Sequence, residues 1–541
     1  MNEWWRGSVT YQVYPRSFQD SDGDGIGDLK GIAERLEHVA RLGADAVWLS
    51  PVFRSPMADM GYDVSDYRDI DPLFGSLADF DALVSRAHAL GLKVIIDQVI
   101  SHCSKDHPAF VESRASRSNS KADWFVWADP RPDGTPPNNW VSVFGGPAWE
   151  WDTRRRQYYL HNFLPSQPDF NFHNPEVQDW HLANMRFWLE RGVDGFRLDT
   201  VNYYFHDRRL RSNPPEEREE NEPAVNPYDM QDHLYSKTQP ENLPFLERIR
   251  ALLDEFPDRA AVGEVGEAKR RAVQVMADYT RGDRRLHMAY SFDMLGPEFT
   301  AAHFRGKIEG FFEGAPDGWP CWAFSNHDVI RHVTRWEKHG ASPEALARLA
   351  AAMLVSFEGS LCLYQAEELG QTETDILFEE LTDPPGIAFW PEYKGRDGCR
   401  TPMVWDDSPN GGFTTGRPWL PVKPPQLARN VASQEGVPGS VLETYRALLA
   451  YRRGSPALRT GRTRFFATPE PLLAFRRDAG GQSIACAFNL SPIPVTIPAK
   501  GGRLSGPAQD ATLVGETLRL GPSGFAFLAP SGATEALVLG G

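Results

Sequence analysis

The stretch GFRLDTV, residues 195–201, is a short apolar run that carries an arginine and an aspartate two positions apart. Apolar and β-branched residues around the charged pair predict a buried strand. Because side chains alternate along a strand, Arg197 and Asp199 point to the same side of it. The stretch therefore predicts a strand that delivers a charged pair at its carboxyl end.

Seven other runs are similar in length and composition, and helical patterns lie between most of them. Residues 29–44 carry apolar side chains at helical spacing, and 76–92 begins with a serine N-cap and ends at a glycine. Alternating strands and helices predict an α/β fold, a (β/α)8 TIM barrel. The alternative is a doubly wound sheet, which would show a Gly-rich phosphate loop after an early strand; the sequence has none. The predicted strands are 9–15, 46–52, 93–99, 195–201, 259–265, 288–292, 321–328 and 361–370.

Two interruptions and one change of pattern divide the chain. Residues 104–172, rich in proline, asparagine and aromatic residues, are too long for a structureless loop and predict an inserted subdomain after the third strand. Short alternating runs predict a C-terminal antiparallel β-domain over 460–541. The barrel is then expected in two parts, 1–103 and 173–459, the second with a Pro-, Gly- and Asp-rich excursion at 371–430.

The composition is that of an acidic globular protein. Of 541 residues, 41% are hydrophobic and 24% charged, and 57 Lys and Arg against 73 Asp and Glu give a net charge of −16. Such a chain is a poor candidate for binding nucleic acid. No apolar run approaches the ~18 residues of a membrane span, and the N-terminal sequence lacks a signal-peptide pattern. Five scattered cysteines fit a reducing compartment, so we expect a cytoplasmic protein with no membrane partner.

Ionisable side chains gather where four of the predicted strands end. A parallel barrel places the carboxyl ends of its strands on one face, which is where such folds carry chemistry. Any one of these side chains could merely cap a helix or pair with a loop, but together they predict an active site. Arg197 is expected to lower the pKa of Asp199 and to keep it ionised as a nucleophile. The residues are Asp97, His102, Arg197, Asp199, Glu264, His327 and Asp328.

The loop DSDGDGIGD, residues 20–28, places four aspartates within nine residues, with glycines between them. So many like charges repel unless a cation neutralises them, and carboxylate oxygens suit Ca²⁺ or Mg²⁺. The loop resembles the first half of an EF-hand but lacks the glutamate at position twelve. It predicts a structural cation site, and the alternative is a solvated acidic turn.

The ordered motifs resemble those of the α-amylase family of glycoside hydrolases, family 13, in its α-glucosidase and oligo-1,6-glucosidase branch. Three positions depart from the family pattern: Phe170 replaces leucine in QPDFN, Ser101 replaces the asparagine before the third-strand histidine, and Ala366 replaces a glycine. The matching stretches are GYDVSDY (61–67), DQVISH (97–102), QPDFN (167–171), GFRLDTV (195–201), GEV (263–265) and SNHD (325–328).

The resemblance implies a role for each catalytic residue. Asp199 would be the nucleophile, Glu264 the general acid and then base, and Asp328 the residue that stabilises the distorted sugar. Because Glu264 must begin protonated, neighbouring negative charge is expected to raise its pKa. The cation site of the branch implies a structural Ca²⁺ or Mg²⁺ held by Asp20, Asp22, Asp24, the Ile26 carbonyl and Asp28.

The resemblance also implies a closed glucose pocket. Tyr62 would stack on the glucose, and Asp63 and Arg400 would grip its distal hydroxyls and close the pocket. The implied substrate-binding residues are Tyr62, Asp63, His102, Phe144, Phe163, Gln167, Arg197, Thr200, His327 and Arg400.

The function implied is that of a retaining, exo-acting α-glucosidase that releases α-glucose from the non-reducing end of short α-glucosides. In the branch, Val after the nucleophile goes with α-1,6 cleavage and Ala or Thr with α-1,4, so Thr200 implies maltose-like linkages. Transfer to a sugar acceptor is open, because water and a sugar hydroxyl compete for one intermediate. The alternatives are an α-1,6-preferring oligoglucosidase, a sucrose-active transglucosidase, and a non-catalytic homologue. The chain lacks the RLDRY-type motif of the sucrose isomerases, and it keeps all three catalytic carboxylates.

Overall fold

A closed parallel sheet forms the centre of the chain in the computed structural model, which describes residues 3–217, 225–267, 269–531 and 538–540. Neighbouring strands follow the order β11-β10-β9-β5-β2-β1-β13-β12, and a parallel bridge between Ala289 and Pro320 joins the two ends. The predicted barrel is confirmed. Its strands are β1 Val9–Val13, β2 Ala46–Leu49, β5 Lys93–Gln98, β9 Gly195–Leu198, β10 Ala260–Val265, β11 Met288–Ser291, β12 Cys321–Ala323 and β13 Ser360–Tyr364.

Each of the eight predicted strands exists, but several end earlier than predicted. β9 ends at Leu198 and β12 at Ala323, so Asp199 and the SNHD motif lie in the turns that follow. In these turns the Val201 N–H donates to the Glu264 carbonyl, and the His327 ring contacts Gln12 and Tyr62. After β13 the chain turns at Ala366, whose φ of 68° is left-handed, a conformation that glycine adopts more readily.

Helices cover the outside of the barrel. α1 starts where the Asp28 side chain accepts the N–H of Gly31, and α2 starts with a capping box between Ser76 and Asp79. The Ser76 cap agrees with the start signal in the sequence, whereas the Asp28 cap was not predicted. The larger helices around the sheet are α1 Leu29–Leu42, α2 Leu77–Ala89, α4 Pro175–Glu190, α5 Asn242–Asp254, α6 Lys269–Thr280, α7 Ala301–Gly314, α9 Pro343–Ser356 and α13 Val441–Arg453.

Two apolar clusters hold the barrel together. The larger one packs the helices against the outer face of the sheet. The smaller one fills the barrel interior with inward-pointing side chains such as Trp48, Ile95, Val262 and Met288. The interior is therefore a packed core, and any substrate site must lie at its mouth.

The insertion after β5 carries its own small sheet. β6 Trp127–Ala128, β8 Gln157–Leu160 and β7 Trp149–Asp152 pair antiparallel in that order, after helix α3 Pro108–Ala115. A short hairpin of β3 Phe53–Arg54 and β4 Asp66–Ile70 follows β2. The 371–430 excursion contains α10 Pro384–Ala388 and α11 Pro424–Leu427, and α12 Val431–Gln434 follows it; α8 His332–Arg335 lies earlier, between β12 and α9.

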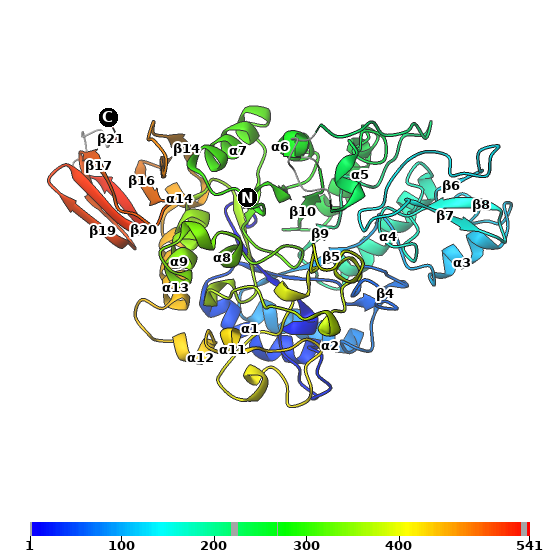
Figure 1. Cartoon of the computed structure of the whole chain (residues 1–541), viewed down its shortest axis with the longest axis horizontal. Coiled ribbons are helices and arrows are strands. Elements are labelled where there is room, and N and C mark those ends of the chain that lie inside the picture. Colours follow the sequence, from blue (N-terminus) through cyan, green and yellow to red (C-terminus); the bar gives the residue numbers. More distant parts are fainter. Residues whose placement is uncertain (1–2, 218–224, 268, 532–537, 541) are drawn as a thin grey trace.

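An antiparallel sheet ends the chain, on the opposite side of the barrel from the inserted sheet (Figure 1). It follows α14 Pro456–Thr460 and has the order β14-β15-β16-β20-β17-β21, with β18 and β19 also pairing with β20. No helix among the residues that the structure describes is long and apolar enough to cross a membrane. The strands are β14 Arg462–Phe465, β15 Leu472–Ala479, β16 Gln482–Asn489, β17 Val495–Lys500, β18 Gly502–Leu504, β19 Gln509–Val514, β20 Thr517–Pro530 and β21 Val538–Leu539.

Candidate active site

One buried guanidinium connects three carboxylates at the barrel mouth. Arg197 Nη1 lies 2.6 Å from Asp199 Oδ1 and 2.9 Å from Asp97 Oδ1, and Nη2 lies 2.5 Å from Glu264 Oε1. The carboxylates come from β5, the end of β9 and β10, which are neighbours in the sheet. The predicted nucleophile and the predicted acid/base are thus adjacent, because both contact the same side chain.

Burial decides the protonation of this cluster. It raises the pKa of Glu264 to about 7; Arg197 opposes the rise and the Asp199 charge adds to it. Burial is the larger cause of this rise, whereas neighbouring negative charge alone was expected from the sequence. For Asp199 the expected direction was wrong: burial outweighs Arg197 and raises its pKa to about 7. Two carboxyls this close titrate together, so one can hold a proton and act as the acid while the other is ionised and acts as the nucleophile.

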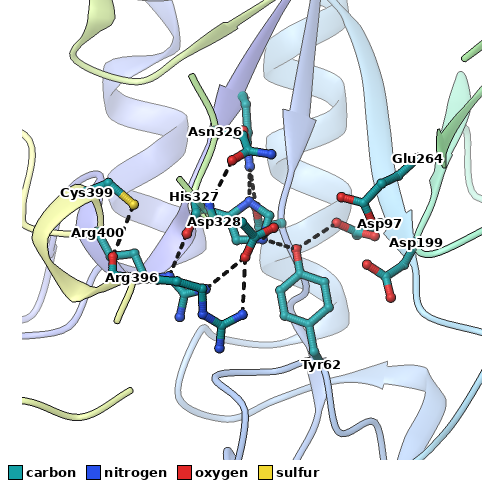
Figure 2. A network of polar contacts seen from close by, with 12 residues as sticks. Tyr62, Asp97, Asp199, Glu264, Asn326, His327, Asp328, Arg396, Cys399 and Arg400 are labelled. Atoms are coloured by element: carbon teal, nitrogen blue, oxygen red, sulfur yellow. Dashed lines mark hydrogen bonds and ion pairs between the residues drawn. The ribbon is translucent and has the colours of Figure 1, made fainter. Parts of the chain in front are cut away.

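Asp328 is held by two arginines and a histidine (Figure 2). Its Oδ1 lies 3.2 Å from Arg396 Nη1 and 3.1 Å from Arg400 Nη2, and its Oδ2 lies 3.2 Å from His327 Nε2. Burial alone would raise the pKa of Asp328, but His327 and the two arginines outweigh it and hold the pKa well below its usual range. Asp328 is therefore a fixed negative charge at the pocket.

The residues that close the pocket differ from those predicted. Asp63 is fully buried behind the pocket wall, where its carboxylate accepts hydrogen bonds from Ser55 Oγ and from the N–H groups of Ala58 and Asp59. Asp59, four residues earlier, lines the pocket instead and pairs with Arg396 at 2.9 Å.

Arg400 also takes a position other than the one predicted. It is 1% exposed and donates to the His327 carbonyl and to Asp328, so it braces the loop that carries Asp328. Arg396 reaches the pocket surface in its place and also pairs with Asp383 at 2.7 Å. Each residue that lines the pocket lies four positions before the predicted one. The sequence motifs alone cannot distinguish the two pairs, because each pair consists of one acid and one arginine.

Tyr62, His102 and His327 form one wall of the pocket, as their predicted roles require. The Tyr62 ring stacks on the His327 ring with 5.3 Å between centroids, and its hydroxyl lies 2.7 Å from His327 Nε2. Burial lowers the pKa of His102 to about 4 and that of His327 to about 3, so both rings are neutral near pH 7. This wall offers hydrogen-bonding groups without adding positive charge.

The inserted subdomain supplies the outer part of the pocket. Phe144 and Phe163 line it, with ring centroids 5.6 Å apart. Gln167 is fully buried; its amide donates to Asp59 Oδ2 and to the Tyr62 carbonyl. Phe144 and Phe163 therefore face the space that a substrate would fill, whereas Gln167 acts on it through Asp59 and Tyr62.

The cavity has a volume of about 440 Å³, within the range of small-molecule sites. Thr200 lines it beside Asp199 and Glu264, whereas Arg197 lies beneath them. The chain's similarities to known proteins agree with this arrangement: the family described as "Alpha amylase, catalytic domain" matches residues 12–461. The chain belongs to the α-amylase family.

Relatives within the α-amylase family support the predicted branch. The chain is 58% identical over 494 residues to a "Probable alpha-glucosidase" of Rhizobium meliloti (strain 1021), with 90% of each chain covered. It is 36% identical over 532 residues to an "Oligo-1,6-glucosidase" of Heyndrickxia coagulans, covering 91% of this chain and 93% of the other.

Solved structures of the α-amylase family resemble the whole chain. An alpha-glucosyl transfer enzyme, XgtA, has a TM-score of 0.94 at 53% identity, over 98% of this chain and 100% of that one. The trehalulose synthase MutB from Pseudomonas mesoacidophila MX-45 has a TM-score of 0.88 at 33% identity, over 97% and 99%. The chain is a glycoside hydrolase of the α-glucosidase and oligo-1,6-glucosidase branch.

Several pocket residues of this α-amylase family member were not predicted from the sequence. Most of them lie on loops and single turns, and Pro385 lies in the short helix α10, so their side chains follow no long helical or strand period that a sequence pattern could reveal. The aromatic residues after β9 and in the 371–430 excursion were the one sequence signal that could have indicated these pocket residues. The unpredicted lining residues are Asp59, Val143, Tyr203, Val225, Asn226, Asp229, Gly266, Phe292, Pro385, Phe389, Glu392, Tyr393 and Arg396.

The acidic loop before α1 lies apart from the pocket. Oxygen atoms of Asp20, Asp22 and Asp28 come within 4.8 Å of one another, and that group does not include Asp24. Burial raises the pKa of Asp24, and the charges of Asp22, Asp20 and Asp28 raise it further. Thr414 of the excursion donates a hydrogen bond to Asp20, which fixes the loop against the excursion. The donor set is all oxygen and negatively charged, which fits a hard cation.

Proposed function

We propose that this glycoside hydrolase cleaves α-glucosides by double displacement and retains the α configuration. The observation that supports it is the shared contact of Asp199 and Glu264 with Arg197, because a retaining enzyme needs its two carboxyls ~5–5.5 Å apart. The names of the relatives, α-glucosidase and oligo-1,6-glucosidase, fit this reaction.

The two steps follow from the charges of the site. The Asp199 carboxylate attacks the anomeric carbon, and Glu264 gives its proton to the departing glycosidic oxygen as the C–O bond breaks. Water then attacks the same carbon, Glu264 takes a proton from it, and Asp199 leaves as a carboxylate. Asp328, held ionised by Arg396 and Arg400, would stabilise the positive charge that develops on the sugar.

The pocket geometry supports attack at chain ends. Arg396 joins Asp59 to Asp328 across the inner end of the cavity, so a longer glucan could not pass through. The enzyme would then remove one glucose from a non-reducing end. Initial rates on maltose, isomaltose, trehalose, sucrose and maltotriose, with product anomers followed by NMR, test this function. Release of α-glucose first supports it, and release of β-glucose first would exclude the double displacement.

We expect maltose to be preferred over isomaltose because Thr200 lines the pocket beside both catalytic carboxylates. Exchanging Thr for Val keeps the shape but removes a hydroxyl. A contact of this kind changes the difference in transition-state binding free energy between two substrates by ~1–3 kcal/mol, which is roughly 10- to 200-fold in specificity. Thr200→Val is expected to narrow or reverse the kcat/KM ratio of the two sugars. A ratio that moves by less than about twofold would assign linkage to the insertion loops instead.

Transfer of glucose to an acceptor is a second candidate activity. The outer cavity is lined by aromatic side chains, among them Phe144, Phe163, Tyr203, Phe389 and Tyr393, which favour a sugar or other ring over water. XgtA, the structural relative at 53% identity, is an alpha-glucosyl transfer enzyme. Transfer products should accumulate with maltose at high concentration. If none form, hydrolysis is the only reaction of the enzyme with this sugar.

We also propose that the loop at 20–28 holds a structural Ca²⁺ or Mg²⁺ through Asp20, Asp22, Asp24, Asp28 and the Ile26 carbonyl. The clustered oxygens of Asp20, Asp22 and Asp28 support it. Asp28 also caps α1, so a cation there would stabilise the start of that helix.

Removal of this cation with a chelator is expected to lower the Tm while the rate at low temperature stays nearly unchanged. The reason is that the loop lies apart from the residues lining the cavity. Calorimetry with elemental analysis is the measurement, and Asp22→Asn should reproduce the loss of Tm. An unchanged Tm with no bound metal would show that the loop is a solvated acidic turn and not a cation site.

We propose a cytoplasmic location and α-glucosides as the partners of the protein. All five cysteines are unpaired and buried, which suits a reducing compartment. No role with nucleic acid is proposed for a chain of net charge −16.

A further inference from the structure

Two hydroxyl groups connect the nucleophile to a histidine. Ser101 Oγ lies 2.8 Å from His102 Nδ1 and 3.0 Å from Thr200 Oγ1, and Thr200 Oγ1 lies 3.3 Å from Asp199 Oδ2. Arg197 holds the other oxygen, Oδ1. Ser101, which stands where asparagine is usual in the family, is 2% exposed.

The backbone of Thr200 contacts the second catalytic carboxyl. Its N–H donates to Glu264 Oε2 at 3.1 Å. Its φ of 40° lies in the left-handed region, which a β-branched residue rarely adopts. Thr200 therefore touches the nucleophile through its side chain and the acid/base through its backbone.

The hydrogen-bonding protons between His102 and Asp199 can be assigned by starting from the histidine. His102 Nε2 lies 2.9 Å from the Tyr62 carbonyl, which can only accept, so the neutral ring carries its proton on Nε2. His102 Nδ1 is then an acceptor, and the Ser101 hydroxyl donates to it. Thr200 has one hydroxyl proton left for two acceptors, Ser101 Oγ and Asp199 Oδ2.

We propose that the Thr200 hydroxyl switches between Asp199 and Ser101 during the reaction, and that Ser101 is a positioning residue which acts through Thr200. This rests on the proposed function, because the double displacement alternates Asp199 between a carboxylate and an ester. The charged carboxylate attracts the Thr200 proton more strongly than a neutral hydroxyl does. Once Asp199 is esterified, Ser101 accepts that proton, so the buried hydroxyl keeps a partner in both states.

The switch predicts opposite effects of two substitutions. Thr200→Val removes a donor to the carboxylate, so the pKa of Asp199 should rise, by about 0.5–1 unit. Ser101→Ala removes the competing acceptor, so Thr200 donates to Asp199 alone and the pKa should fall by about 0.2–0.5 unit. In the Thr200→Val background, Ser101→Ala should cause no further shift, and Thr200→Ser should behave like the parent.

Two readouts measure these shifts. The first is the acid limb of kcat/KM for 4-nitrophenyl α-glucoside, which moves to higher pH when the Asp199 pKa rises. The second is the pH titration of the Asp199 carboxyl carbon by ¹³C NMR, assigned with Asp199→Asn, which needs no turnover. The groups that face Asp199 are common to all variants, so differences between variants report the switch. They are Arg197, Asp97, Asp328, Glu264, Tyr62, Tyr67 and Tyr204.

Ser325→Ala is the matched control, since Ser325 Oγ lies 2.9 Å from His332 Nδ1 in a second buried Ser–His pair. It should lower the Tm and leave the Asp199 titration unchanged. Shifts of Ser101→Ala and Thr200→Val in the same direction, or a Ser101→Ala shift that persists without the Thr200 hydroxyl, would overturn the switch. A parent enzyme that releases no α-glucose would refute the proposed function instead, while the NMR titration would still test the hydroxyl pair.

Discussion

Asp199→Asn is expected to lower kcat on maltose by roughly 10⁴-fold, because an amide is a poor nucleophile. Arg197 would keep its ion pairs with Asp97 and Glu264, so the pocket should hold its shape and the Tm should change little. Steady-state rates and calorimetry on the same preparation separate lost chemistry from lost folding.

A stronger test of the nucleophile is the stereochemistry of the product that forms when azide replaces the missing carboxylate. Asp199→Gly leaves room on the face that the carboxylate occupied, and azide can enter there and attack an aryl α-glucoside as Glu264 protonates the leaving oxygen. The product should be β-glucosyl azide. Asp152→Asn, at a buried carboxylate paired with Arg114 outside the pocket, is the control and should keep full activity. Full activity of Asp199→Asn would refute its role.

Arg396→Ala is expected to lower kcat/KM roughly 10²- to 10³-fold and also to lower the Tm. The guanidinium contacts Asp59, Asp328 and Asp383. Removing one partner of a buried pair costs about 3–5 kcal/mol, because the remaining charges stay buried. Kinetics on maltose and calorimetry are the measurements.

Two further arginine variants define what Arg396 contributes. Arg396→Lys keeps the charge but not the planar fork, so it should recover stability in part and activity less. Arg248→Ala removes an exposed pair with Asp179 and should leave both unchanged. If Arg396→Ala bound and cleaved maltose like the parent, the pocket would be closed by other residues.

The fold could be predicted because its signals are local and repeated. Runs such as GFRLDTV and caps such as Ser76 lie within a few residues of the elements they define. The ends of β9 and β12 were placed too late, because apolar composition alone does not show where Asp199 and Asn326 leave the ladder for side-chain contacts.

The site was predictable where a strand end delivers the residue and less so elsewhere. Asp199 and Glu264 follow their strands, so their convergence was evident. Arg396 lies in an irregular excursion, and its contact with Asp59 joins residues 337 positions apart. Burial, which sets the pKa of Asp199, depends on the whole surrounding fold and is not encoded by the neighbouring arginine.

The closure of the sheet by β1 and β13 has a consequence for synthesis on the ribosome. Val9 pairs with Leu361, so one edge of the first strand has no partner until about 350 further residues have been made. At about 5–20 residues per second, this takes roughly 20–70 s. An unpaired apolar edge invites pairing with other chains. We therefore expect the nascent chain to depend on chaperones until β13 emerges.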